Sequence, residues 1–180
     1  SKLQPGHILT ISDPEQSLPP SKPYWSLAQA ASDGAANPFP GTEAESLDAF
    51  DDLLHQAIAM RMEADVPLGA LLSGGVDSSV VAAIMQERSS RPVKTFTIGF
   101  EERVHDESVQ ARAIAQYLGT DHTELMLSAA DALGVVPRLA QMFDEPLADA
   151  SQIPTFLICG LARRSVTVAL TGDGGDELFG

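Results

Sequence analysis

One short segment determines how the rest of the chain is interpreted: Ser73-Gly74-Gly75-Val76-Asp77-Ser78-Ser79. It follows the continuously apolar run 67–72, which predicts a short strand buried on both faces. A helix is predicted after it, over residues 78–87, where apolar residues recur. The two glycines allow successive backbone N–H groups to converge on one point, and the helix adds unpaired N–H groups and the positive end of its dipole. This segment, the first loop, therefore predicts an anion cradle.

The acidic residue inside the first loop indicates a metal. Asp77 would repel a phosphate ligand unless a divalent cation lay between them, so the pattern implies Mg²⁺. The loop has neither the Gly-Lys-Ser/Thr of the Walker pattern nor the dinucleotide fingerprint G-x-G-x-x-G. A simpler alternative is a tight strand-to-helix turn in which Asp77 and Ser78 only cap the helix, and the full string in this context favours phosphate binding over it.

A second glycine-rich segment, the second loop, occurs at 171–177 as Thr-Gly-Asp-Gly-Gly-Asp-Glu, directly after the predicted strand 166–170. Its three carboxylates, Asp173, Asp176 and Glu177, suit magnesium, or an acid or base with a shifted pKa, better than a bare phosphate. A solvated acidic turn is the alternative for this segment alone. Ligands of parallel sheets bind at the carboxyl ends of the strands, so two such loops at one edge favour a site.

Strands and helices alternate on both sides of the first loop. Further strands are predicted at 93–100 and 123–127, and further helices at 106–118, 129–143 (interrupted by Gly134 and Pro137) and 151–164. Parallel strands require crossover connections, and helices supply them here. The fold class predicted is α/β, with three layers, α/β/α, around a mostly parallel sheet.

The amino-terminal region differs in composition. Residues 1–41 are rich in proline and predict a short strand or hairpin plus a linker. A helix is predicted to begin at Thr42, where Thr42-x-x-Glu45 fits a capping box, and to run to about Met62. The expected organisation is therefore a linker at 1–41 and one domain at 42–180.

Composition excludes several classes of function. Eleven Lys and Arg against 25 Asp and Glu give a formal net charge of −14 over 180 residues, which argues against nonspecific binding to nucleic acid or anionic membranes. With a mean hydropathy of +0.01 and scattered apolar residues, no membrane span is expected. The only cysteine, Cys159, cannot form an intramolecular disulfide and is expected to be buried. With no signal-peptide pattern, a cytoplasmic location is expected.

Together, the two loops resemble a known family. Ser-Gly-Gly-x-Asp-Ser-Ser is similar to the pyrophosphate-binding loop of the N-type ATP pyrophosphatases. The second loop, with Asp144-Glu145-Pro146 and Ser151-Gln152-Ile153-Pro154-Thr155, resembles the synthetase domain of glutamine-hydrolysing asparagine synthetases. The resemblance covers nearly the whole chain. It implies the adenine-nucleotide alpha-hydrolase-like (PP-loop) fold.

The resemblance also implies roles for individual residues. It makes the pyrophosphate cradle from Ser73, Gly74, Gly75, Asp77, Ser78 and Ser79. Two catalytic aspartates, Asp77 and Asp176, would hold Mg²⁺ against the ATP phosphates. The adenosine site would be lined by Leu72, Ile98, Thr171 and Gly172. Asp173, where many members have Glu, would be the catalytic carboxylate tied to adenylation and amide formation.

The implied reaction is the ATP-dependent adenylation of the aspartate side chain, followed by displacement of AMP by ammonia to give asparagine. A relative that adenylates another carboxylate, in surface-sugar or antibiotic synthesis, and a noncatalytic nucleotide-binding fragment are the alternatives. The resemblance implies a preceding glutaminase domain with an amino-terminal Cys as the ammonia source, whereas this chain begins Ser1-Lys2 and ends within the second motif. A truncated, incomplete enzyme is therefore expected. Oligomeric state, a homodimer included, is left open.

Overall fold

The computed structural model describes all residues except 1, 14, 102–106, 144–147 and 180, so the predicted Asp144-Glu145-Pro146 segment lies outside the described residues. The chain divides into two compact units, Ser1–Phe50 and Asp51–Gly180. Their boundary falls inside a long helix, nine residues after the boundary expected from composition.

The first unit holds the predicted hairpin and a helix that the sequence patterns did not predict. β1 (His7–Ile8) pairs antiparallel with β2 (Lys22–Pro23). The additional helix is α1 (Leu27–Ala36), whose first turn is capped by Ser26, since its hydroxyl accepts from the Gln29 N–H at 3.3 Å. No residue of α1 is buried, and the helix lies within the stretch 1–41 for which the proline content predicts a linker.

The long helix α2 (Glu43–Met62) begins where the sequence predicts it. The Thr42 N–H donates to the Glu45 carboxylate at 2.7 Å, and the Glu45 N–H donates to the Thr42 hydroxyl at 3.3 Å. This reciprocal pair is the expected capping box. Within the second unit, Ile58 of α2 is buried against the core cluster that includes Ala70 and Met85.

A four-stranded parallel sheet forms the centre of the second unit, in the order β5-β4-β3-β6. Its strands are β3 (Leu68–Leu71), β4 (Lys94–Phe100), β5 (Asp121–Leu127) and β6 (Val168–Leu170). The chain builds outward from β3 to β5 on one side and then returns to place β6 on the other side of β3. The strand order therefore reverses at β3, and a crevice for ligands is expected at the carboxyl end of such a reversal.

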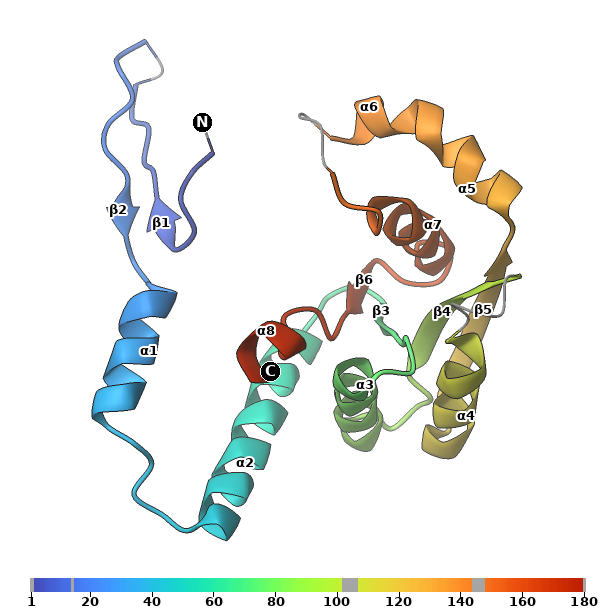
Figure 1. Cartoon of the computed structure of the whole chain (residues 1–180), viewed down its shortest axis with the longest axis horizontal. Helices are drawn as coiled ribbons and strands as arrows, with labels where there is room; N and C mark the ends of the chain where they lie inside the picture. Colours follow the sequence, from blue (N-terminus) through green and yellow to red (C-terminus); the bar gives the residue numbers. More distant parts are fainter. Residues whose placement is uncertain (1, 14, 102–106, 144–147, 180) are drawn as a thin grey trace. The chain divides into compact units, whose positions relative to one another are not determined.

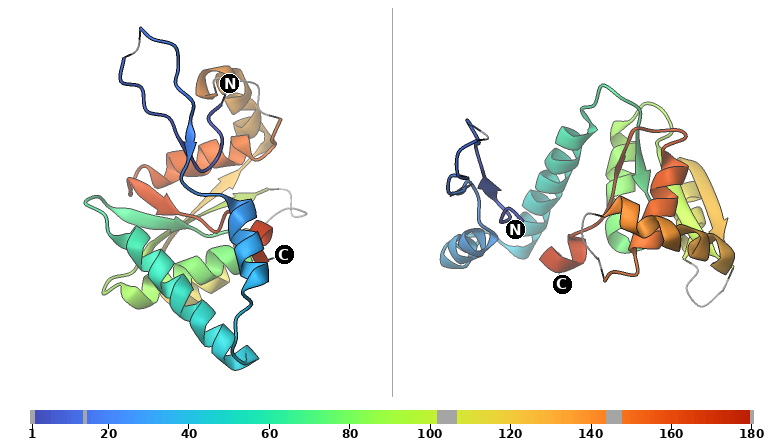
Figure 2. Two further views of the ribbon diagram at one scale, coloured as in Figure 1. Left: turned by 90° about the vertical axis from the view of Figure 1, so that its left-hand side faces the viewer. Right: turned by 90° about the horizontal axis from the view of Figure 1, so that it is seen from above.

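Helices cover both faces of this sheet (Figures 1 and 2). α3 (Val76–Arg88) and α4 (Ser108–Leu118) pack on one face, and α7 (Gln152–Ala162) packs on the other. The first interface buries Leu72, Ala82, Ala111 and Ala115, and the second buries Phe96, Leu161, Ala162 and Val166. The three-layer α/β/α fold predicted from the alternation of strands and helices is confirmed.

The remaining helices are short. The predicted helix over 129–143 consists of α5 (Ala129–Val135), a 3₁₀ turn at Val136–Arg138 and α6 (Leu139–Met142), with Pro137 in the turn. The chain ends in α8 (Gly175–Phe179).

One expectation was wrong, since Cys159 is exposed on α7 and not buried. No helix in the described part of the chain is long and apolar enough to cross a membrane.

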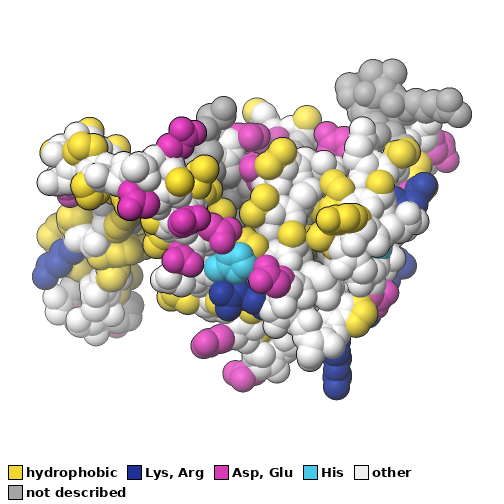
Figure 3. Space-filling view, turned by 90° about the horizontal axis from the view of Figure 1, so that it is seen from below, with side chains coloured by type: hydrophobic (Ala, Val, Ile, Leu, Met, Phe, Trp, Pro, Cys, Tyr) yellow, Lys and Arg dark blue, Asp and Glu magenta, His cyan; other side chains and the backbone are white. Residues whose placement is uncertain are grey.

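Acidic side chains are spread over the surface, as the composition predicts. Figure 3 shows them in magenta over one face, with a histidine flanked by acidic groups. In the second unit, His55 Nε2 lies 3.7 Å from the Asp51 carboxylate and 3.8 Å from that of Glu87. Surface pairs of this kind contribute little to stability.

A small polar network joins β4 to β5. The Thr95 hydroxyl lies 2.8 Å from that of Thr120 and 2.9 Å from His122 Nδ1. His122 Nε2 is buried and has no hydrogen-bond partner among the described residues. Burial lowers the pKa of His122, the nearby Glu124 carboxylate opposes this shift, and Arg112 adds to it.

We expect the chain to lose stability as the pH falls below about 6.5, the usual pKa of histidine. The pKa of His122 is lower in the folded chain than in the unfolded chain. As the pH falls from about 6.5 towards the folded-state pKa, the unfolded chain therefore binds more protons than the folded chain, and stability is lost. In His122→Asn this contribution should vanish, which makes the variant's free energy of unfolding less pH-dependent by at most about 1.4 kcal/mol per pH unit. Urea unfolding of both chains between about pH 7.5 and 5.5 measures the difference. Parallel curves would exclude His122 as the group responsible.

Candidate functional site

A cavity of about 1010 Å³ opens at the carboxyl ends of β3, β4 and β6. It is lined by ten of the residues predicted for the site: Leu72, Ser73, Gly75, Asp77, Ser78, Ile98, Thr171, Gly172, Asp173 and Asp176. The cavity lies where the strand order reverses, and both glycine-rich loops border it. The structure thus brings the two predicted motifs together at one site.

Serine hydroxyls organise the first loop from within. Ser78 is buried, and its hydroxyl accepts from the Ser73 N–H at 3.2 Å and lies 2.9 Å from the Ser73 hydroxyl. The Gly75 N–H donates to the Ser73 hydroxyl at 3.3 Å. The loop leads directly into α3, whose thirteen residues give it a full helix dipole directed at the cavity. These features fit the predicted anion cradle.

Two predicted residues of the cradle do not line the cavity. Gly74 has a φ of +88°, and a Cβ there would lie 2.9 Å from Gln110 Cβ and 3.0 Å from the Ala111 N. Its role in the structure is to let the loop pack closely against α4. The Ser79 hydroxyl donates to the Gly75 carbonyl at 2.5 Å, which ties it to the first turn of α3.

The second loop packs directly on the first. A Cβ on Gly172 would lie 2.6 Å from the Ser78 N and 2.9 Å from the Asp77 carbonyl carbon, and one on Gly175 would lie 2.2 Å from an Asp77 carboxylate oxygen. Both approaches are closer than any side chain allows. The absence of side chains at these two glycines therefore brings Asp77 to the acidic second loop.

The described charged side chains that line the cavity are all acidic. Its carboxylates are Asp77, Glu107, Asp149, Asp173, Asp176 and Glu177, and none of the described lining residues is Lys, Arg or His. Hydrogen bonds from the Ser151 backbone N–H, then from its side chain, lower the pKa of Asp149, so this carboxylate stays charged. A polyanion can bind in such surroundings only together with cations.

The carboxylates of the cavity suit a magnesium ion that is bound mainly through the phosphates of a nucleotide. Among the described residues, no group of three or more His, Cys, Asp or Glu is arranged to enclose a metal. Mg²⁺ in nucleotide sites retains water and phosphate oxygens and needs only one or two protein carboxylates. Asp77 and Asp176, both lining the cavity beside the cradle, fit that requirement.

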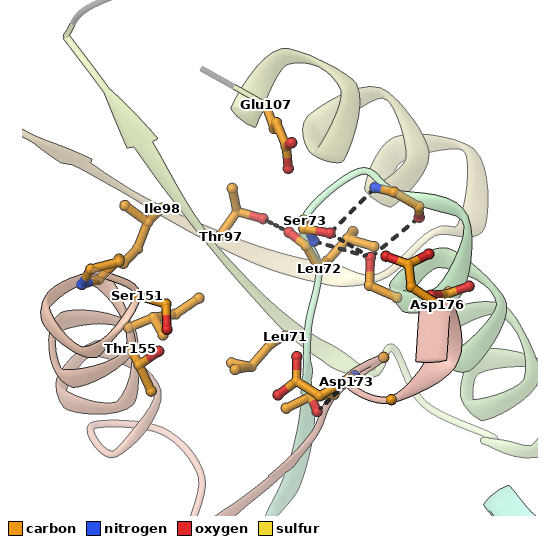
Figure 4. A pocket seen from close by; sticks show the side chains of 18 of the residues that line it. Leu71, Leu72, Ser73, Thr97, Ile98, Glu107, Ser151, Thr155, Asp173 and Asp176 are labelled. Carbon is orange, nitrogen blue, oxygen red and sulfur yellow. Dashed lines mark hydrogen bonds between the residues drawn. The ribbon is translucent and has the colours of Figure 1, made fainter. Parts of the chain in front are cut away.

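Several lining residues were not assigned to the site from the sequence. They are Thr97 on β4, Glu107 before α4, and Asp149, Ser151 and Thr155 around the start of α7. Figure 4 shows Ser151 and Thr155 across the cavity from Asp176. Ser151 and Thr155 belong to a motif that carries the family resemblance, but the resemblance gave neither residue a role at the site. Asp149 lies two residues before Ser151, a spacing typical of a local turn that does not indicate a ligand.

The three-layer α/β/α fold and the two loops at one edge of its sheet place the chain in the PP-loop fold class. A solved structure, the NH3-dependent NAD synthetase from Campylobacter jejuni, shares this fold, with a TM-score of 0.52 and 12% sequence identity over 74% of this chain and 60% of that one. At this identity the likeness concerns the fold alone.

Sequence comparison identifies the family. The family model described as asparagine synthase matches residues 49–180, and the chain belongs to this family. It is 41% identical over 129 residues to the putative asparagine synthetase [glutamine-hydrolyzing] 2 of Methanocaldococcus jannaschii, covering 71% of this chain and 25% of that protein. It is 37% identical over 129 residues to asparagine synthetase [glutamine-hydrolyzing] 1 of Bacillus subtilis, covering 72% of this chain and 20% of that protein. The chain thus spans a fifth to a quarter of these relatives.

Proposed function

We propose that the chain is the nucleotide-binding part of an ATP-dependent ligase that converts aspartate to asparagine. The observation that carries this proposal is the contact between the two loops, where Gly172 packs on the backbone of Asp77 and Ser78. This contact brings the first loop, which we propose binds the phosphates, to the carboxylates of the second loop at one cavity. Membership of the asparagine synthase family and the names of the two relatives support the amide-forming reaction.

The proposed reaction has two steps. A carboxylate oxygen of aspartate attacks the α-phosphorus of ATP, the bond from this phosphorus to the oxygen shared with the β-phosphate breaks, and pyrophosphate leaves. Ammonia then attacks the acyl carbon of the adenylate. The bond from this carbon to the oxygen that it shares with the α-phosphorus breaks, AMP leaves with that oxygen, and the nitrogen gives up a proton. The cavity, of about 1010 Å³, is large enough for a nucleotide.

The residues of the chain would act mainly by positioning. The helix α3 and the hydroxyls of Ser73 and Ser78 would hold the β- and γ-phosphates, where charge develops on the leaving pyrophosphate. Asp77 and Asp176 would hold Mg²⁺, which when bound supplies positive charge against the phosphate oxygens. The adenosine would contact Leu72, Ile98, Thr171 and Gly172, and Asp173 would serve the adenylation and amide-forming steps.

The source of ammonia would lie outside this chain. We propose that residues 1–41, which contain the hairpin β1-β2, link this domain to a preceding glutaminase domain. Such a domain would release ammonia from glutamine, and the names of the two relatives describe those proteins as glutamine-hydrolyzing.

Two measurements test the proposed function. Calorimetric titration of the chain with Mg·ATP should show binding that disappears when EDTA removes the metal. The full-length protein should exchange labelled pyrophosphate into ATP only when aspartate is present. Exchange with a different carboxylic acid would assign the chain to another amide-forming relative, and metal-dependent binding without exchange would identify a binding module.

A further inference from the structure

Thr97 is a buried residue of β4 whose hydroxyl reaches the start of the first loop. Its side chain is 2% exposed, and its hydroxyl donates to the carbonyl of Leu72. Figure 4 shows this bond between the two residues at the edge of the cavity. The Leu72 N–H in turn donates to the Phe96 carbonyl at 2.9 Å. Leu72, the last residue before the loop, is thus bound to β4 through both of its backbone groups.

The peptide group between Leu72 and Ser73 is also held at its other end. The Ser73 N–H, which belongs to the same rigid plane as the Leu72 carbonyl, donates to the Ser78 hydroxyl at 3.2 Å. Ser78 is only 7% exposed. One peptide plane is therefore fixed between two buried hydroxyls, one from β4 and one from α3. A rotation of this plane would break both hydrogen bonds.

We infer that Thr97 is a positioning residue for the anion site, because its hydroxyl fixes the peptide plane from which the first loop departs. The direction of that plane determines where the following N–H groups of the loop are aimed. Donors aimed before the ligand arrives need no reorganisation when charge appears on it. The inference deepens the proposed function, since the anion it concerns is the pyrophosphate portion of ATP.

A neighbouring threonine offers a matched control. Thr95 lies two residues earlier on β4, so its side chain is on the same face of the sheet. It is fully buried, but its hydroxyl contacts Thr120 and His122 and does not line the cavity. Thr95→Val and Thr97→Val remove the same hydroxyl from the same strand. They differ in the partners of that hydroxyl, which are the Leu72 carbonyl beside the first loop for Thr97 and the side chains of Thr120 and His122 for Thr95.

Hydrogen exchange of the ligand-free chain tests the positioning role directly. In Thr97→Val, the Ser73 amide should exchange about tenfold faster than in the parent chain, because the Leu72 carbonyl has lost its donor. Thr97→Ser keeps the hydroxyl and should restore slow exchange. Thr95→Val should leave the Ser73 amide unchanged, although it lowers the melting temperature to a similar extent. Equal acceleration by both valine variants, or none by Thr97→Val, would overturn the inference.

Binding of inorganic pyrophosphate with Mg²⁺ tests the consequence for the site. Thr97→Val should bind about tenfold more weakly than the parent chain, and Thr97→Ser and Thr95→Val should bind within about twofold of it. Parental affinity in Thr97→Val, or an equal loss in Thr95→Val, would contradict the role at the anion site. If the parent chain itself does not bind pyrophosphate, the proposed function fails, and the exchange rates still decide whether Thr97 fixes the loop.

Discussion

Asp77→Asn should weaken the binding of Mg·ATP by about 100-fold or more, a loss of about 2.7 kcal/mol. The amide has nearly the shape of the carboxylate, so the contact of Gly175 with this side chain is preserved. What is lost is the negative charge that holds the metal between protein and phosphate. Asp176→Asn should have a comparable effect, because both residues line the cavity beside the cradle. Calorimetric titration measures both.

When the metal is absent, we expect Asp77→Asn to have no weakening effect on the binding of ATP. Without Mg²⁺, Asp77 faces the phosphates as a like charge, so Asp77→Asn should bind metal-free ATP at least as well as the parent chain does. Asp52→Asn is the control, since it changes the net charge equally at an exposed position on α2. It should bind Mg·ATP as the parent does. Equal binding of Mg·ATP by parent and Asp77→Asn would exclude Asp77 as a ligand of the metal.

Local patterns in the sequence were sufficient to predict the fold around the site. The apolar run at 67–72 and the helix predicted over 78–87 correspond to β3 and α3, and the run 166–170 contains β6. Each is short and uniform in character, so period and composition identify it without tertiary information. The prediction that both loops lie at one site followed from a general property of parallel sheets, because the carboxyl ends of their strands lie at the same edge.

Other features depend on contacts between distant residues and could not be predicted. Thr97 is indistinguishable in sequence from Thr95, and only the pairing of β3 with β4 places its hydroxyl beside Leu72. Helix α1 has a clear N-cap at Ser26, but it lies between proline-rich segments whose composition predicts a linker. Cys159 was expected to be buried because it lies in an apolar run, but it is exposed on α7.

Gly172→Ala should both destabilise the second unit and reduce binding of Mg·ATP, because the added methyl group would meet main-chain atoms. Its Cβ would lie 2.6 Å from the Ser78 N, which is fixed within the first turn of α3. The second loop would have to move away from the first. We expect the free energy of unfolding to fall by about 1–3 kcal/mol, as in other overpacked sites. Urea unfolding and calorimetric titration measure the two effects.

Alanine substitutions at two other glycines distinguish the effect on stability from the effect on Mg·ATP binding. At Gly175 the added Cβ would collide with the Asp77 carboxylate, which can rotate away, so Gly175→Ala should weaken metal-dependent binding with a smaller loss of stability. At Gly160, inside α7, nothing lies within 4 Å of the added Cβ, and alanine should stabilise the chain by about 0.5–1 kcal/mol. If Gly172→Ala were as stable as Gly160→Ala and bound Mg·ATP like the parent chain, the close packing of the two loops would not be needed to form the site.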